Sequence, residues 1–167
     1  MPVAVTTCPV CATTARAVKL ITLKALLTPA ALATLDPQET HRFCPDAACD
    51  VVYFSASQTY QQAEVKVPVF QRDERGLTPV CYCFGHTRAD LEHAVREGHP
   101  GAIPQSIQAH IQAGRCGCEV NNPQGSCCLG NVNRTLAALT GSTEILDGRL
   151  RRTRPRTGQG PALPPAP

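Results

Sequence analysis

The sequence of 167 residues predicts an α+β protein, in which a small β-rich unit is followed by a helical unit and a disordered C-terminal tail. Three observations favour this order. Short segments rich in β-branched and aromatic residues occur within residues 1–70. Apolar residues recur at helical spacing within residues 80–141. Residues 142–167 are rich in arginine and proline and lack an apolar period from about residue 149 onward, which is typical of a disordered segment.

The first unit, residues 1–70, contains patterns for strands and one short helix. Val18–Thr22 is expected to be a short strand. Residues 28–35 (TPAALATL) are expected to be helical, because Thr28 can cap a helix whose first position is Pro29. Further strands are expected at residues 50–55 (DVVYFS) and 63–70 (AEVKVPVF), and a polar linker at residues 71–79.

Three helices are expected in the second unit, residues 80–141. Thr87 and Asp90 have the spacing of a capping box, so a helix should begin there and stop at Gly98. A second helix fits Pro104–Ala113, where two isoleucines lie one turn apart. The third helix is expected to begin at Cys127 or Cys128, to end at Gly141, and to carry Leu129, Val132, Leu136 and Leu139 at helical spacing.

Ten cysteines are the most informative residues of the sequence, and they fall into five close pairs. Close pairs indicate chelation, because two thiolates from one loop can hold one ion, whereas secreted disulfide frameworks tie distant loops. The sequence shows no signal peptide and no apolar run of about 20 residues, as a membrane span requires. We therefore expect a reducing, cytoplasmic setting without membrane insertion; a disulfide-bonded protein is the alternative.

The cysteines of the first unit form a C-x2-C pair and a C-x4-C pair, separated by enough chain for a strand and a helix. Four thiolates from two such loops suit zinc in a closed tetrahedral site. His41 and Asp46 are nearby in the sequence and are alternative ligands, although a surface position is favoured for each. The four expected zinc ligands are Cys8, Cys11, Cys44 and Cys49.

Six cysteines of the second unit compete for the four thiolate positions that usually hold a 2Fe-2S cluster. Cys81 and Cys83 form a C-x-C pair, and Gly85 behind them lets the backbone approach a cluster. Strong turn residues within residues 116–128 (CGCEVNNPQGSCC) can bring the two ends of that segment together. A second zinc site, or extra buried thiols, is the alternative. The residues alone leave two choices open, Cys116 or Cys118 and Cys127 or Cys128.

Four motifs in this order, CPVC, FCPDAACDVVYF, PVCYC and NNPQGSCC, resemble the N-terminal domain of CopZ-type copper chaperones over roughly residues 5–140. From PVCYCFG onward the sequence is also similar to bacterioferritin-associated ferredoxin-like 2Fe-2S modules. The resemblance implies one zinc held by the four cysteines of the first unit. It implies a 2Fe-2S cluster held by Cys81, Cys83, Cys118 and Cys128, with Cys116 and Cys127 as additional thiols.

The sequence departs from this family pattern after its last cysteine. CopZ-type proteins of this kind continue into a heavy-metal-associated domain with a C-x-x-C copper motif, and here no cysteine follows Cys128. The resemblance therefore implies the redox half of such a chaperone without its copper-carrying half.

The function expected from these patterns is one-electron transfer linked to the handling of copper or another heavy metal, in a metallochaperone-like protein with a metal-transport or redox partner. The alternatives are a ferredoxin-like partner of another redox protein and a zinc-stabilised interaction module. No catalytic motif is recognised, so we expect no enzyme. Five arginines between Arg149 and Arg156 exceed the net charge of +3, so the basic character belongs to the tail and no nucleic-acid partner is expected.

Overall fold

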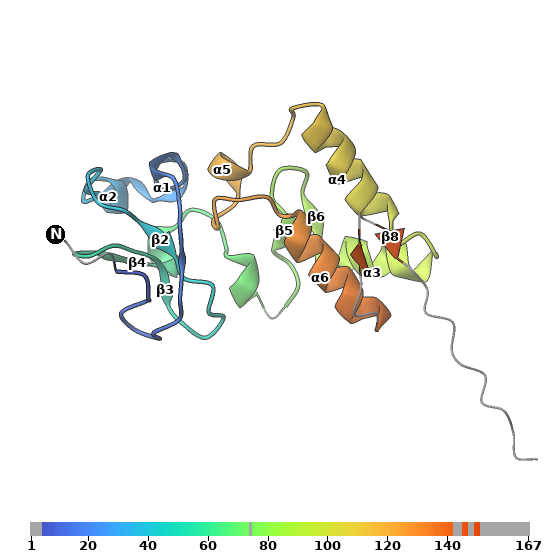
Figure 1. Ribbon diagram of the computed structural model, residues 1–167, viewed down its shortest axis with the longest axis horizontal. Helices are drawn as coiled ribbons and strands as arrows, with labels where there is room; N and C mark the ends of the chain where they lie inside the picture. The colour runs from blue at the N-terminus through green and yellow to red at the C-terminus, as the bar shows by residue number, and fades with distance from the viewer. Residues whose placement is uncertain (1–4, 74, 142–144, 147–148, 151–167) are drawn as a thin grey trace, which may run out of the picture.

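The computed structural model describes residues 5–73 and 75–141, together with two short strands at residues 145–146 and 149–150. A unit built on a β-sheet lies beside a unit built on helices, along the long axis of the molecule (Figure 1). The expected α+β class and the order of the two units are therefore confirmed.

The first unit is a four-stranded antiparallel sheet with strand order β1-β2-β3-β4. Its strand β3 is the segment of β-branched and aromatic residues expected from the sequence, and all four of its residues are buried. Two short helices, α1 and α2, follow β1 along the chain, and Thr28 caps α2 with Pro29 at its first position, as expected. The bounds are β1 Arg16–Ala17, α1 Leu20–Leu26, α2 Pro29–Leu32, β2 Arg42–Phe43, β3 Val51–Phe54 and β4 Thr59–Gln61.

Two of the expected strands are wrong. Most of Val18–Thr22 lies in or directly before helix α1, because the leucines that follow bury one helical face, with Leu23 and Leu27 fully buried. Residues 63–70 form no strand but contain parts of two 3-10 turns, η1 (Gln62–Glu64) and η2 (Phe70–Arg72). Pro68 lacks the N–H that a sheet ladder needs, which disfavours a strand there.

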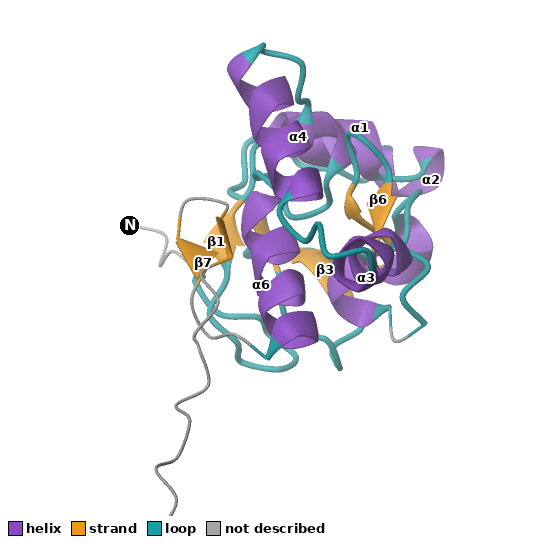
Figure 2. Ribbon diagram, turned by 90° about the vertical axis from the view of Figure 1, so that its right-hand side faces the viewer, coloured by secondary structure: helices purple, strands orange, loops and turns teal. Residues whose placement is uncertain are grey.

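The second unit packs three helices together around a small apolar core (Figure 2). Helices α3 and α4 both contact α6, and the hairpin of β5 and β6 leads into α3. All three helices expected in this unit are present. The bounds are β5 Pro79–Cys81, β6 His86–Thr87, α3 Arg88–Arg96, α4 Ala102–Gln112, α5 Cys118–Asn121 and α6 Leu129–Thr140.

The signals that begin α3 and end α6 are the ones found in the sequence, whereas α4 begins at Ala102, two residues before the expected Pro104. Thr87 Oγ1 accepts the N–H of Asp90 at 3.3 Å, and the Asp90 carboxylate accepts the N–H of Thr87 at 2.7 Å, which completes the capping box. Gly141 ends α6 in the left-handed conformation with φ of 66°. Local sequence therefore sets these ends.

The two units are joined by direct contacts as well as by the chain. Helix α5 of the second unit lies beside α1 of the first (Figure 1), and Lys19 forms an ion pair with Glu119 across this contact. The buried Tyr53 hydroxyl donates to the carbonyl of Pro123 at 2.6 Å. The loop between α5 and α6, residues 122–128, therefore rests on the sheet unit.

The C-terminal segment, residues 142–167, was expected to be disordered. Within it, strands β7 (Ile145–Leu146) and β8 (Arg149–Leu150) pair antiparallel, which differs from the expectation at those residues. The remainder of the segment lies outside the described residues. None of the described helices is both long enough and apolar enough to cross a membrane.

Candidate metal centres

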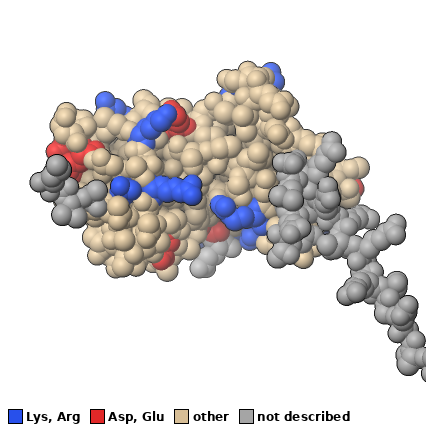
Figure 3. Space-filling view, viewed as in Figure 1, with Lys and Arg blue, Asp and Glu red and all other residues tan. Residues whose placement is uncertain are grey.

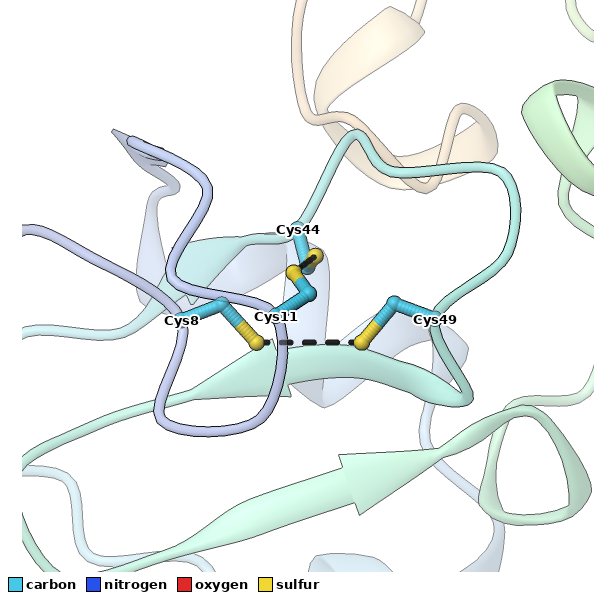
Figure 4. Close-up of side chains that lie close together, drawn as sticks. All are labelled: Cys8, Cys11, Cys44 and Cys49. Carbon is cyan, nitrogen blue, oxygen red and sulfur yellow. Dashed lines mark hydrogen bonds between the residues drawn. The ribbon is translucent and has the colours of Figure 1, made fainter.

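The four cysteines of the sheet unit point toward one another (Figure 4). Their Sγ atoms all lie within 4.8 Å of one another. Cys8 and Cys49 have sulfurs 3.8 Å apart, and Cys11 and Cys44 have sulfurs 3.5 Å apart. A tetrahedral zinc ion with Zn–S bonds of about 2.3 Å separates its ligand sulfurs by about 3.8 Å. The arrangement therefore fits one zinc ion.

Two tight turns bring these thiols together. In the first, the N–H of Cys8 donates to Thr13 O and the N–H of Ala12 donates to Cys8 O, each at 2.9 Å. Ala12 takes a left-handed φ of 59°, which closes the turn around Cys11. Cys44 follows strand β2 directly and donates its N–H to Val52 O at 2.9 Å.

The thiols of this group differ in the direction in which their surroundings shift the pKa. Burial raises the pKa of Cys44 and that of Cys49 above the ordinary value, because a buried thiolate loses its hydration. Hydrogen bonds from Thr13 lower the pKa of Cys11 to about 6. A cation that replaces the remaining protons removes the cost of burying thiolates, so the soft donor set favours zinc binding with release of protons.

His41 and Asp46, the alternative ligands, are engaged elsewhere. His41 is buried, not on the surface as favoured from the sequence, and its Nδ1 lies 3.1 Å from Glu39 O. Burial lowers the pKa of this imidazole. Asp46 accepts the N–H of Ala48 at 2.8 Å and the hydroxyl of Thr13 at 3.2 Å. Asp46 therefore shapes the loop between Cys44 and Cys49.

A second group of thiols lies where β5, α5 and the start of α6 meet. The sulfurs of Cys83 and Cys118 are 3.6 Å apart. Interaction with the Cys128 thiol lowers the pKa of Cys81 to about 7 and that of Cys118 to about 5. Cys81 and Cys128 lie in the buried apolar core of the helical unit, and Cys83 and Cys118 pack against that core. Only the zinc-site cysteines form a fully compact metal-ligand group among the described residues, so this second group is the more extended one.

The chain surrounds this second group with donors for sulfur. The N–H of Gly117 donates to Cys83 Sγ at 3.3 Å, and Asn121 Nδ2 donates to the same sulfur at 3.7 Å. Gly85 takes a φ of 72° and donates its N–H to Cys81 O at 2.9 Å, so the C-x-C loop turns sharply as expected. Asn121 was missed from the sequence, since an asparagine in a polar turn carries no signal for a thiolate contact.

The remaining cysteines, Cys116 and Cys127, are not among the residues of that apolar core. Cys127 is exposed and Cys116 is partly buried. Both line an open cavity of about 510 Å³, together with Cys118 and the apolar side chains of Ile111 and Val120. Cys128, by contrast, is buried at the N-terminal end of α6, where free N–H groups favour negative charge. Cys118 and Cys128 share the core with the C-x-C pair, and their role as cluster ligands in place of Cys116 and Cys127 stays a prediction.

Comparison with known proteins agrees with the zinc-site geometry. Residues 5–66 match the family model of the CopZ zinc-binding domain, which includes all four cysteines of the compact group. The chain is also similar to the X-ray structure of the Archaeoglobus fulgidus CopZ N-terminal domain, with a TM-score of 0.64 and 26% sequence identity. Residues 5–66 therefore correspond to a zinc-binding domain of the CopZ type.

The likeness to the CopZ N-terminal domain reaches beyond the zinc-binding residues. It covers 77% of this chain and 95% of that domain, a larger share than residues 5–66 alone, so the helical unit takes part in it. No curated protein sequence matches the chain significantly. Zinc binding is thus supported both by the family model and by the four-cysteine geometry.

Proposed function

We propose that this CopZ-like chain is a metallochaperone-like protein that performs one-electron transfer linked to the handling of copper or another heavy metal. The observation that carries the proposal is the presence of two separate groups of four thiols: a compact one in the sheet unit and an extended one in the apolar core of the helical unit. The zinc ligands are Cys8, Cys11, Cys44 and Cys49, and the cluster ligands are Cys81, Cys83, Cys118 and Cys128.

The compact group supports a structural role for zinc. Four thiolates complete a tetrahedral site and leave no position for a substrate. The site joins the loop at Cys8 and Cys11 to the two ends of the β2–β3 connection, at Cys44 and Cys49. Zinc therefore stabilises the sheet on which the helical unit rests.

The extended group supports a 2Fe-2S cluster. Four thiols from three loops converge there, backbone and side-chain N–H groups face Cys83, and Cys128 lies at a helix N-terminus. This donor set is that of a binuclear iron–sulfur site. When bound, the cluster supplies a one-electron couple.

The cavity beside Cys118 supports contact with a soft metal ion. Cu(I) prefers thiolate ligands, and Cys116 and Cys127 both line this cavity without taking part in the four-thiol group. We expect these two thiols to serve as transient ligands for the cargo. A metal-transport or redox protein is the expected partner.

The proposed function includes no nucleic-acid partner. On the face seen in Figure 3, lysine and arginine side chains are interspersed with acidic ones and separated by uncharged surface. Such a face offers no continuous path for a phosphate backbone.

The experiment is reduction of Cu(II) by the anaerobically reduced protein in the presence of a colorimetric Cu(I) chelator. We expect about one Cu(I) per reduced chain, since a 2Fe-2S centre transfers one electron. Cys83→Ser should abolish this yield while the zinc content stays unchanged, and Gln108→Ala, on the exposed face of α4, should leave both unchanged. A reduced protein that yields no Cu(I) but passes electrons to an acceptor protein would favour the ferredoxin-like function instead.

A further inference from the structure

The 3-10 turn η2, Phe70–Arg72, lies between the two thiol groups (green in Figure 1, beside the loop that leads to α6). The sequence predicts a polar linker for its last two residues. In the structure each of its three residues makes a hydrogen bond to a different loop, and each of these loops carries or adjoins cysteines.

Arg72 contacts the zinc-site loop. Its Nη2 donates to the carbonyl oxygens of Cys44, at 3.4 Å, and Val51. Its Nε and Nη1 are buried and have no hydrogen-bond partner among the described residues. A zinc ion with four thiolates has a net negative charge, so a buried guanidinium on the backbone of a ligand residue stabilises the loaded site.

Gln71 contacts the loop that leads to Cys128. Its Nε2 donates to Gln124 Oε1 at 2.9 Å, and the same oxygen accepts from Asn131 Nδ2 at 2.8 Å. Gln124 Nε2 in turn donates to Cys127 O at 3.1 Å. One side chain, Gln124, therefore ties η2 to the segment directly before the last cysteine.

Phe70 contacts the C-x-C loop. Its N–H donates to the hydroxyl of Tyr82 at 2.8 Å, and that hydroxyl donates to Pro68 O at 2.7 Å. Tyr82 stands between the two cysteines of the C-x-C pair. The turn thus holds two of the three segments that supply the extended thiol group, all except α5 with Cys118.

We propose that η2 is a strut through which zinc binding stabilises the cluster site, with Gln71, Arg72 and Gln124 as positioning residues. Zinc fixes the loop at Cys44, the fixed carbonyls order Arg72, and the ordered turn holds the C-x-C loop and the residue 122–128 loop in place. Coupling carried by such contacts is reciprocal in binding free energy, so a bound cluster also raises the affinity of the compact site for zinc. This inference rests on the proposed function only where the cluster itself is measured. The ordering of the loops can be measured in a protein without iron.

The test compares the full chain with Gln71→Ala, which removes one amide contact and leaves both thiol groups intact. Gln108→Ala is the matched control, because that glutamine is exposed and makes no described side-chain hydrogen bond. The first readout is the decay of visible cluster absorption under anaerobic conditions, with and without a zinc chelator. The second is backbone hydrogen exchange of residues 122–128 in the same samples.

In the wild type we expect zinc removal to speed cluster loss by at least about fivefold, the lower end of usual coupling between sites. With zinc bound, Gln71→Ala should lose its cluster faster than the Gln108→Ala control. Adding the zinc chelator should then change the rate of cluster loss less in Gln71→Ala than in the control. Exchange at residues 122–128 should rise on zinc removal in the wild type and control, and should already be raised in Gln71→Ala.

Two results separate this inference from the proposed function. If neither the cluster lifetime nor the hydrogen exchange of residues 122–128 changes on zinc removal or in Gln71→Ala, the proposed role of η2 is wrong, while both centres stay in place. A chain that takes up zinc but no iron would overturn the cluster, and the exchange readout would still decide whether η2 transmits zinc binding.

Discussion

Gly125 is the residue at which the loop before the last two cysteines meets the sheet unit. Its φ of 68° lies in the left-handed region, and a Cβ there would stand 3.0 Å from Thr22 Oγ1 and 3.2 Å from Val18 Cγ1. Both atoms belong to the first unit, at helix α1 and just before it. A glycine is therefore required here for two reasons, the backbone conformation and the close contact.

We expect Gly125→Ala to destabilise the protein more than Gly98→Ala. Gly98 has a similar φ of 77° but open space where its Cβ would be, so it measures the backbone cost alone, about 1–2 kcal/mol. The contact with Thr22 and Val18 should add to that cost in Gly125→Ala. Urea unfolding of the zinc-loaded variants measures the difference, and equal losses in both would show that the two units do not pack tightly at this loop.

At the scale of elements, the capping box of α3 makes the stability of the protein depend on pH. Hydrogen bonds from the backbone and hydroxyl of Thr87 lower the pKa of Asp90 below its ordinary value. A carboxyl whose pKa is lower in the folded state contributes stability that is fully present above its unfolded pKa, about 4, and is lost as pH falls through the folded value.

We therefore expect Asp90→Asn to lower stability at neutral pH and to flatten its decline below about pH 4. Thermal unfolding between neutral and acid pH, in zinc-loaded samples, provides the measurement. Asp50→Asn is a suitable comparison, because that exposed carboxyl makes no described side-chain hydrogen bond. The account of the cap would be contradicted if both variants kept the acid dependence of the wild type.

Elements with strong local signals are the ones that sequence predicts. The capping box, the proline after Thr28 and the β-branched segment of β3 act within a few residues, so they could be recognised. Helix α1 was missed because valine, isoleucine and threonine favour strands locally, while its leucines gain from burial against a sheet that forms later in the chain. The two 3-10 turns, η1 and η2, have no pattern of their own.

For the candidate sites too, the sequence predicts what depends on neighbouring residues and not what depends on tertiary contacts. Cysteine spacing is local, and it indicated both thiol groups. The grouping of Cys118 with Cys83 depends on how the loop at Gly117 folds back over 35 residues of sequence separation, which spacing alone does not determine. The roles of Gln71, Arg72 and Gln124 arise only from tertiary contact between the two units.

At the scale of the whole molecule, the protein consists of two small units with modest apolar cores. Each unit contains a group of cysteines, and the two units also contact each other. Few aromatic residues are available, since the sequence has four Phe, three Tyr and no Trp. Metal binding that occurs only in the folded state adds directly to stability. The zinc site, and the cluster site as proposed, would therefore contribute to the stability of the fold as well as to function.

The most direct test of the two-centre account is metal and sulfide analysis of the anaerobically purified chain, with electron paramagnetic resonance after reduction. The account predicts about one zinc, about two iron and about two sulfide per chain, and a rhombic signal from the reduced sample. A colourless protein with about two zinc and no iron, even after anaerobic cluster reconstitution, would contradict it and leave a zinc-stabilised interaction module.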